Sequence, residues 1–151
     1  MIIFLDFDGV LHPFLDRSSA KAFCYMPRLE KVLREFSSVQ IVIASTQREV
    51  VPLALLRAQF APDIAARIIG VTPIVEIRNA GDVVGSRHRE ILAYLNGSGA
   101  GWLALDDDAS LFPHGCAELV LCDDGFRDHE ERALRTALDR VPSVKKLERP
   151  K

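Results

Sequence analysis

The chain has 151 residues, of which 48% are hydrophobic and 26% are charged, a composition that is usual for one soluble domain with a buried core. Its 19 basic and 21 acidic residues nearly cancel and give a formal net charge of −2 at pH 7. This balance excludes a strong overall field that would attract nucleic acid or an anionic membrane, so any partner has to be recognised by a local site.

The first half of the chain predicts an alternation of strands and helices. Residues 2–7 and Val39–Ala44 are continuous apolar runs, which predict strands covered on both faces. Between them, Pro27 opens a predicted amphipathic helix. A second helix is expected near Glu49–Phe60, and a short strand is expected at residues 67–71.

The second half continues the same pattern. A helix is expected at Arg87–Leu95, strands at residues 101–106 and 117–122, and a last helix near Asp128–Asp139. Such alternation predicts the α/β class, with a three-layer, doubly wound (Rossmann-like) parallel sheet. Ligands of these sheets bind beyond the carboxyl ends of the strands, which is where a functional site is expected.

We expect one domain over residues 1–141, followed by a polar, basic tail at residues 142–151. The three cysteines are scattered and lack a CxxC spacing, which favours neither a disulfide framework nor a zinc site. The opening apolar run is too short to span a membrane, and Asp6 interrupts it where a signal peptide would continue. We therefore expect a cytoplasmic protein without a membrane partner.

Carboxylates follow two of the predicted strands. Asp6 and Asp8 come after the first strand, and Asp106 and Asp107 come at the end of the strand at residues 101–106. We expect these four side chains to meet at one edge of the sheet. Two like charges about 4 Å apart repel by roughly 4 kcal/mol at an effective dielectric constant near 20, so a cation should neutralise them. Oxygen ligands of this kind suit Mg²⁺.

Any one of these aspartates could be explained as a turn or helix-cap residue, but their occurrence together at two strand ends favours a cation-binding site. Ser45 and Thr46 end another predicted strand, and Arg87 opens the helix before the acidic pair. Taken together, these side chains are interpreted as phosphate ligands. Arg48 is a further candidate for contacting a phosphate, and Gly9 lets the backbone turn sharply past the site.

The order of these motifs resembles that of the haloacid dehalogenase-like (HAD) superfamily: DFDGV, a strand ending in Ser45, the helix-borne Arg87, and LDD. A closer similarity is to the HAD domains of the "Swiss army knife" RNA repair proteins. It rests on STQR at 45–48, GVTP at 70–73, RHREILAYL at 87–95, ALDDD at 104–108 and the later DDGF. The resemblance implies a HAD-like fold, and the short intervals between motifs predict a member without a large cap domain.

The resemblance also implies roles for the four carboxylates. Asp6 would be the nucleophile that forms an aspartyl phosphate. Asp8 would be the general acid for the leaving oxygen and then the general base for water. Asp106, assisted by Asp107, would hold Mg²⁺ together with Asp6 and the backbone carbonyl of Asp8.

For the other two motifs, more than one residue can fill the family's position. Ser45 would bind the transferring phosphoryl group, with Thr46 as its replacement if the strand ends one residue later. Arg87 would take the place of the usual lysine, and Arg78 or Arg89 could compete for that place. An arginine there is a departure, because a planar guanidinium can grip a phosphate with two N–H groups but reaches differently from an ammonium.

The function expected from this resemblance is a Mg²⁺-dependent phosphomonoesterase that acts through an aspartyl phosphate. A site without a cap accepts a phosphate on a bulky partner, so a nucleic-acid 5′ or 3′ phosphate end is the expected substrate. The alternatives are a phosphatase for proteins or small molecules, and a non-catalytic domain that senses phosphate. A receiver domain is disfavoured because the strand RIIGV does not end in aspartate.

Overall fold

The computed structural model describes residues 1–16 and 18–142. Five parallel strands form one sheet in the order β3-β2-β1-β4-β5. Their bounds are β1 Ile2–Leu5, β2 Gln40–Ile43, β3 Ile68–Val71, β4 Trp102–Asp106 and β5 Leu119–Leu121. The predicted strands are therefore all present, and the predicted α/β fold is confirmed. Most of the expected tail, residues 143–151, lies outside the described residues.

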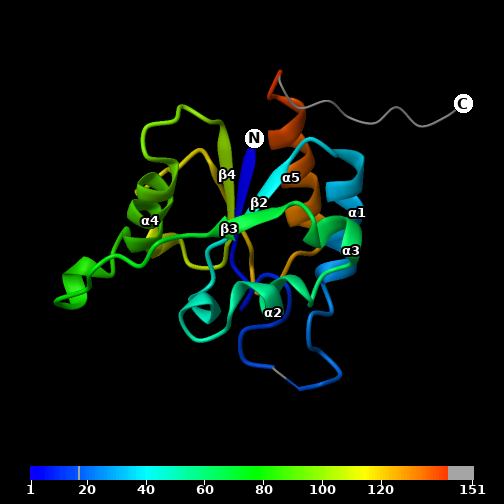
Figure 1. Cartoon of the computed structure of the whole chain (residues 1–151), viewed down its shortest axis with the longest axis horizontal. Coiled ribbons are helices and arrows are strands. Elements are labelled where there is room, and N and C mark those ends of the chain that lie inside the picture. Colours follow the sequence, from blue (N-terminus) through cyan, green and yellow to red (C-terminus); the bar gives the residue numbers. More distant parts are fainter. Residues whose placement is uncertain (17, 143–151) are drawn as a thin grey trace, which may run out of the picture.

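Helices cover both faces of the sheet (Figure 1). They are α1 Met26–Glu35, α2 Leu53–Arg57, α3 Pro62–Ala65, α4 Ser86–Leu95 and α5 Asp128–Asp139. One hydrophobic cluster joins one face of the strands to apolar side chains of α1, α2, α3 and α5. A second cluster joins the other face to α4, through Ile91, Tyr94 and Leu95. The sheet is thus the middle of three layers, as predicted.

The expected helix at Glu49–Phe60 is wrong in its bounds. Thr46–Glu49 forms a 3-10 turn, and α2 begins only after Pro52. Proline disfavours helical backbone in the residue before it and lacks the N–H that a continuous helix needs, so Pro52 separates the two segments. The chain then forms a further short helix, α3, at Pro62–Ala65, which was not expected.

The intervals between the motifs are filled by short helices, turns and extended loops. In the part of the chain that the structure describes, every strand belongs to the one sheet, and no cap of comparable size is inserted. No described helix combines the length and the apolar character needed to cross a membrane.

One arginine connects the end of α1, the turn into β2 and the start of β3. Arg67, just before β3, donates hydrogen bonds to the carbonyl oxygens of Leu33 (2.7 Å), Phe36 (2.8 Å) and Val39 (2.7 and 2.9 Å). These carbonyls lie in the last turn of α1 and in the turn into β2, where those of Leu33 and Phe36 also accept from the N–H groups of Phe36 and Val39. Arg67 therefore fixes the crossover that leads from α1 into the second strand.

The register of the central strands fixes which residues meet at the carboxyl edge. Leu5 of β1 is paired with Ile43 of β2 on one side and with Leu105 of β4 on the other. The Asp6 N–H donates to the Leu105 carbonyl at 3.0 Å, which continues the ladder by one residue. Asp6 and Asp106 consequently lie at the same level on neighbouring strands.

Candidate active site

Three carboxylates meet at this edge. Asp6, Asp106 and Asp107 each offer an oxygen, and these oxygens all lie within 4.8 Å of one another. Asp6 and Asp106 are buried, and Asp107 is partly buried. Hard oxygen donors at this spacing are the kind of set that Mg²⁺ prefers. Among the described residues, this is the one cluster of at least three metal-binding side chains.

Burial makes this cluster unfavourable when all its members are ionised. Burial first, and then the charge of Asp106, raise the pKa of Asp6 well above its usual range. Burial likewise raises the pKa of Asp106 to about 6 and moves the pKa of Asp107 upward. Asp6 therefore does not keep the ordinary pKa of an aspartate in the chain alone, because desolvation penalises its charged form.

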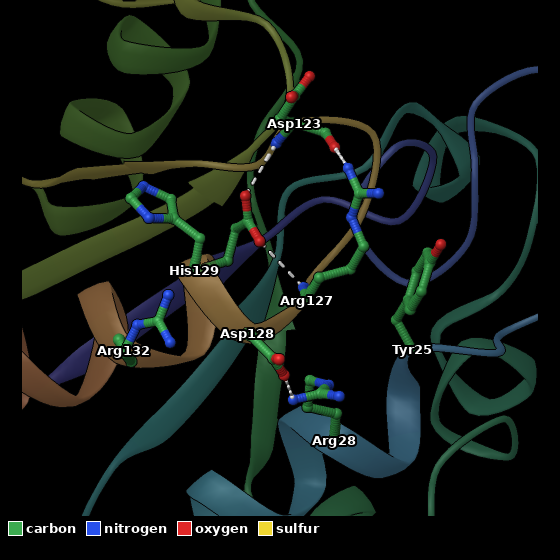
Figure 2. Close-up of a pocket in the computed structure, with 8 residues that line it drawn as sticks. Tyr25, Arg28, Asp123, Arg127, Asp128, His129 and Arg132 are labelled. Carbon is green, nitrogen blue, oxygen red and sulfur yellow. Dashed lines mark hydrogen bonds and ion pairs between the residues drawn. The ribbon is translucent and has the colours of Figure 1, made fainter.

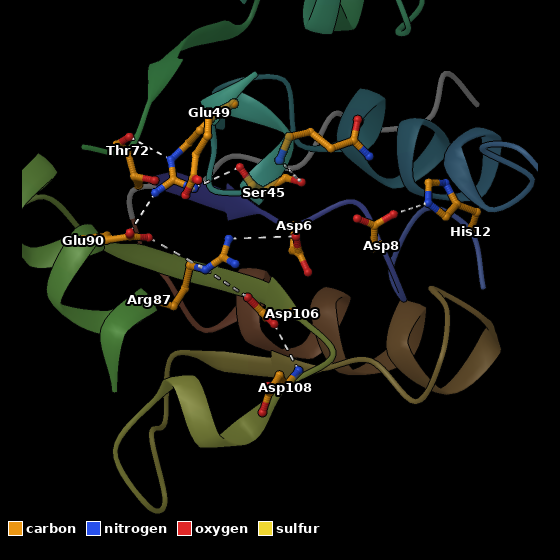
Figure 3. A network of polar contacts seen from close by, with 12 residues as sticks. Asp6, Asp8, His12, Ser45, Glu49, Thr72, Arg87, Glu90, Asp106 and Asp108 are labelled. Carbon is orange, nitrogen blue, oxygen red and sulfur yellow. Dashed lines mark hydrogen bonds and ion pairs between the residues drawn. The ribbon is translucent and has the colours of Figure 1, made fainter. Parts of the chain in front are cut away.

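Arg87 supplies positive charge beside the cluster. Its Nη1 lies 3.8 Å from Asp6 Oδ1, and its Nε lies 3.6 Å from Asp106 Oδ2 (Figure 3). Its charge lowers the pKa of both aspartates and so opposes the effect of burial. Arg87 is only 6% exposed, and its Nη1 is buried without a hydrogen-bond partner. A buried, unpartnered guanidinium nitrogen beside two carboxylates suits an incoming anion.

The two competing arginines lie elsewhere. Arg78 is exposed and forms an ion pair with Glu76 at 2.8 Å. Arg89 is exposed and donates to the carbonyl oxygens of Val84 and Asp82. Neither lines the cavity that the carboxylates share, whereas Arg87 does. The geometry thus favours Arg87 among the three candidates.

Arg48 is placed differently from the phosphate contact that we expected. Its buried side chain donates to the carbonyl oxygens of Thr72 (2.9 Å), Ser45 (3.0 Å) and Pro73 (3.2 Å). It also pairs with buried Glu90, Nη2 to Oε1, at 2.8 Å. Because its donors are used in this way and it does not line the cavity, the geometry favours a structural role for Arg48.

Glu90 links this structural arginine to the site. Its Oε2 lies 4.0 Å from the Nε of Arg87, one turn earlier on α4. A chain of alternating charges therefore runs from Arg48 through Glu90 and Arg87 to Asp6 (Figure 3). Sequence reasoning missed Glu90, although its position three residues after Arg87 is a spacing at which helical side chains meet.

Of the two hydroxyl candidates, one faces the cavity. Ser45 is fully buried, and its Oγ accepts a hydrogen bond from the Gln47 N–H at 3.3 Å, which caps the 3-10 turn. Thr46 is exposed and lines the cavity with Asp6 and Arg87. Of the two candidates, Thr46 is therefore the one that lines the cavity.

Asp8 lies on the loop after β1 and also lines the cavity. Its Oδ1 is 2.7 Å from Nε2 of His12, which is buried. Gly9 follows with a φ of +74°, and a Cβ there would lie 2.2 Å from Asp107 Oδ2. Only glycine permits both this backbone conformation and this approach of Asp107.

The cavity is open and has a volume of about 350 Å³. Phe14, which is 48% exposed, and Leu111 form apolar parts of its wall. The Phe14 N–H donates to Asp124 Oδ1 at 2.7 Å, which anchors the loop that carries the ring. The remaining lining residues are polar: Asp6, Asp8, Thr46, Arg87, Asp106, Asp107 and Asp108.

A second cavity, of about 570 Å³, lies between the starts of α1 and α5 (Figure 2). Its polar groups largely engage one another: Arg28 forms an ion pair with Asp128, and the Arg127 guanidinium donates to the backbone carbonyl oxygen of Asp123. Although it is larger, it brings together no cluster of metal-binding side chains. The chemistry therefore favours the smaller cavity as the site.

Comparison with protein families identifies the kind of domain. The model of the HAD domain in Swiss Army Knife RNA repair proteins matches residues 2–130. The chain belongs to this family. The match runs from β1 into α5, so it includes all the residues of the candidate site, and it confirms the HAD resemblance found in the sequence. Searches of curated proteins and of solved structures gave no match.

The other residues that sequence reasoning missed are His12 and Phe14. The sequence does not single out His12, since a histidine four residues from an aspartate in a loop has no fixed spatial relation to it. Phe14 carries no signal at all in the sequence, because the path of the loop decides whether its ring faces the cavity or the core.

Proposed function

We propose that this HAD domain is a Mg²⁺-dependent phosphomonoesterase that acts through an aspartyl phosphate on Asp6. The observation that carries the proposal is the cluster of buried carboxylates with the unpartnered Arg87 nitrogen beside it. Both lie at the carboxyl edge of a parallel sheet, where such folds bind their ligands. The family match supports the same class of reaction.

The residues present fit a magnesium ion. Asp6, Asp106 and Asp107 would hold it, and the backbone carbonyl of Asp8 would add a fourth ligand, as the HAD resemblance implies. The raised pKa values of Asp6 and Asp106 support this reading, because a bound divalent cation would stabilise the ionised carboxylates that burial disfavours. When bound, the ion would neutralise charge on the phosphoryl oxygens and on the attacking carboxylate.

The reaction divides into two steps. In the first, an Asp6 oxygen attacks phosphorus, the bond to the leaving oxygen breaks, and that oxygen takes a proton from Asp8. In the second, water attacks the aspartyl phosphate, its proton passes to Asp8, and the bond from phosphorus to Asp6 breaks. Arg87 would donate its free Nη1–H to a phosphoryl oxygen, and Thr46 lines the same cavity.

A phosphate at a nucleic-acid end is the substrate that we propose. The family is described by its place in RNA repair proteins, and the described chain inserts no large cap over the site. The half-exposed ring of Phe14 at the cavity wall offers a surface on which a terminal base can stack. Small phosphate esters would use the same carboxylates but would gain nothing from this ring.

A panel assay tests the proposal. Phosphate release would be measured with Mg²⁺ from oligonucleotides phosphorylated at the 5′ or 3′ end, nucleotides, sugar phosphates and phosphopeptides. We expect release from oligonucleotides, loss of release with EDTA, and loss in the Asp6→Asn variant. Turnover of small phosphates or phosphopeptides without oligonucleotide turnover would reject the substrate. Tight binding of phosphorylated ends without any turnover would instead indicate a sensor.

A further inference from the structure

The carboxyl group of Asp8 is held by a histidine from its own loop. Nε2 of His12 lies 2.7 Å from Asp8 Oδ1. The backbone fixes the spacing of the two residues, because they form an isolated bridge and the Gly9 N–H donates to the His12 carbonyl at 2.9 Å. Figure 3 shows the pair on the side of the site away from Arg87.

The surroundings of His12 are mostly apolar and offer its ring few polar partners. The residue is 6% exposed, and its ring packs edge-on against Phe23 with centroids 5.3 Å apart. Nδ1 is buried without a hydrogen-bond partner. A buried polar atom without a partner is unfavourable, so an apolar side chain would serve packing better here. Among the residues that the structure describes, Asp8 is the one polar contact of this ring.

We infer that His12 is a positioning residue for Asp8, an inference that rests on the proposed phosphatase function. With its proton on Nε2, the neutral imidazole donates to Asp8 Oδ1 and fixes the plane of the carboxyl group. Oδ2 then carries the proton that passes to the leaving oxygen in the first step and accepts the proton of water in the second. His12 itself gains and loses no proton.

The proton from Asp8 matters unequally for different leaving groups. An alkoxide, such as a sugar hydroxyl of an oligonucleotide, is a strong base and needs the proton as its bond to phosphorus breaks. The p-nitrophenolate ion is a weak base and leaves without it. Since kcat/KM reports the steps up to the departure of the leaving group, this constant separates the two cases.

The test compares His12→Ala with the wild-type chain on a phosphorylated oligonucleotide and on p-nitrophenyl phosphate. We expect kcat/KM to fall by about tenfold or more on the oligonucleotide and to stay nearly unchanged on p-nitrophenyl phosphate. The kcat for p-nitrophenyl phosphate should fall, and a burst of one p-nitrophenolate per chain should appear, because the water step also uses Asp8. A merely structural loss would lower both kcat/KM values together.

Two variants complete the design. His12→Gln can place an amide N–H near the position of Nε2 and should restore most of the oligonucleotide activity. His129→Ala removes a histidine from the separate second cavity and should match the wild type. Equal losses on both substrates, or no rescue by glutamine, would overturn the inference while leaving the phosphatase proposal intact. A wild-type chain inactive on both substrates would reject the phosphatase proposal itself.

Discussion

At the scale of single residues, the site depends on where one guanidinium lies. Arg87 contacts Asp6 and Asp106 at 3.8 and 3.6 Å, distances that are too long for hydrogen bonds but short enough for electrostatic attraction. Glu90, three residues later, restrains it from the other side. The side chain is thus held near the carboxylates while one of its nitrogens keeps the capacity to bind an anion.

Arg87→Ala should therefore lower kcat/KM on p-nitrophenyl phosphate by about 10²-fold or more, because it removes a charged donor from the phosphoryl group. Arg87→Lys should keep part of the activity, since an ammonium supplies charge but not two directed N–H groups. The matched control is Arg89→Ala, on the exposed face of the same helix. A similar loss in both alanine variants would contradict the role of Arg87.

Phe14 allows a second prediction at this scale. If its ring stacks on a terminal base, Phe14→Ala should raise KM for a phosphorylated oligonucleotide by about tenfold, given the roughly 1–3 kcal/mol of such stacking. The KM for p-nitrophenyl phosphate should change little. Leu15, which is 90% exposed and does not line the cavity, provides the control variant Leu15→Ala. Equal changes for both substrates would argue against a stacking contact.

At the scale of elements, the strands were easier to predict than the loops. Each strand is a run of apolar residues buried on both faces, and parallel pairing brings the ends of such runs to one edge; this is why Asp6 and Asp106 could be expected to meet. The choice between Arg87 and Arg89 could not be made in this way. Two residues turn a helix by about 200°, so the answer required knowing which face of α4 meets the sheet.

The loops were harder because their contacts come from distant segments. Arg48 was expected to reach a phosphate, but the carbonyls after β3 and the side chain of Glu90 engage it instead. Nothing near Arg48 in the sequence announces those partners. The family match likewise supports the class of reaction, phosphate ester hydrolysis, but does not assign roles to single side chains.

Arg67 gives a prediction about an element junction. Arg67→Ala removes the guanidinium hydrogen bonds to the carbonyls of Leu33, Phe36 and Val39, and we expect a loss of about 2 kcal/mol in the free energy of unfolding. Urea denaturation would measure this loss. Arg78→Ala, which breaks the exposed pair with Glu76, should change stability by at most about 0.5 kcal/mol. Comparable losses in the two variants would contradict the role of Arg67.

At the scale of the whole molecule, the buried acids couple folding to pH. Burial raises the pKa of Asp106 to about 6 from an ordinary 3.8, so the folded chain binds this proton more tightly than the unfolded chain does. Its contribution to stability is present at low pH and is lost as pH rises through about 6. Groups with lowered values, such as Glu131 and Asp63, act in the opposite sense but at lower pH.

Without Mg²⁺, the melting temperature should therefore fall between pH 5 and pH 7.5. Mg²⁺ should reduce that fall, because a bound cation stabilises the ionised carboxylates. Asp106→Asn should flatten the dependence even with EDTA present. Thermal unfolding followed by circular dichroism at the two pH values would check this. A steady rise of the melting temperature across this range in EDTA would contradict it.

The close approach of Gly9 to Asp107 joins two loops that are far apart in the sequence. With a Cβ position only 2.2 Å from the Asp107 carboxylate, even the smallest side chain at residue 9 has to push that oxygen aside. The conformation of the loop that carries Asp8 and His12 therefore depends on the position of the loop that carries Asp107, and the reverse is also true. Neither can be re-engineered alone: a redesigned loop on one side has to be matched to its counterpart on the other.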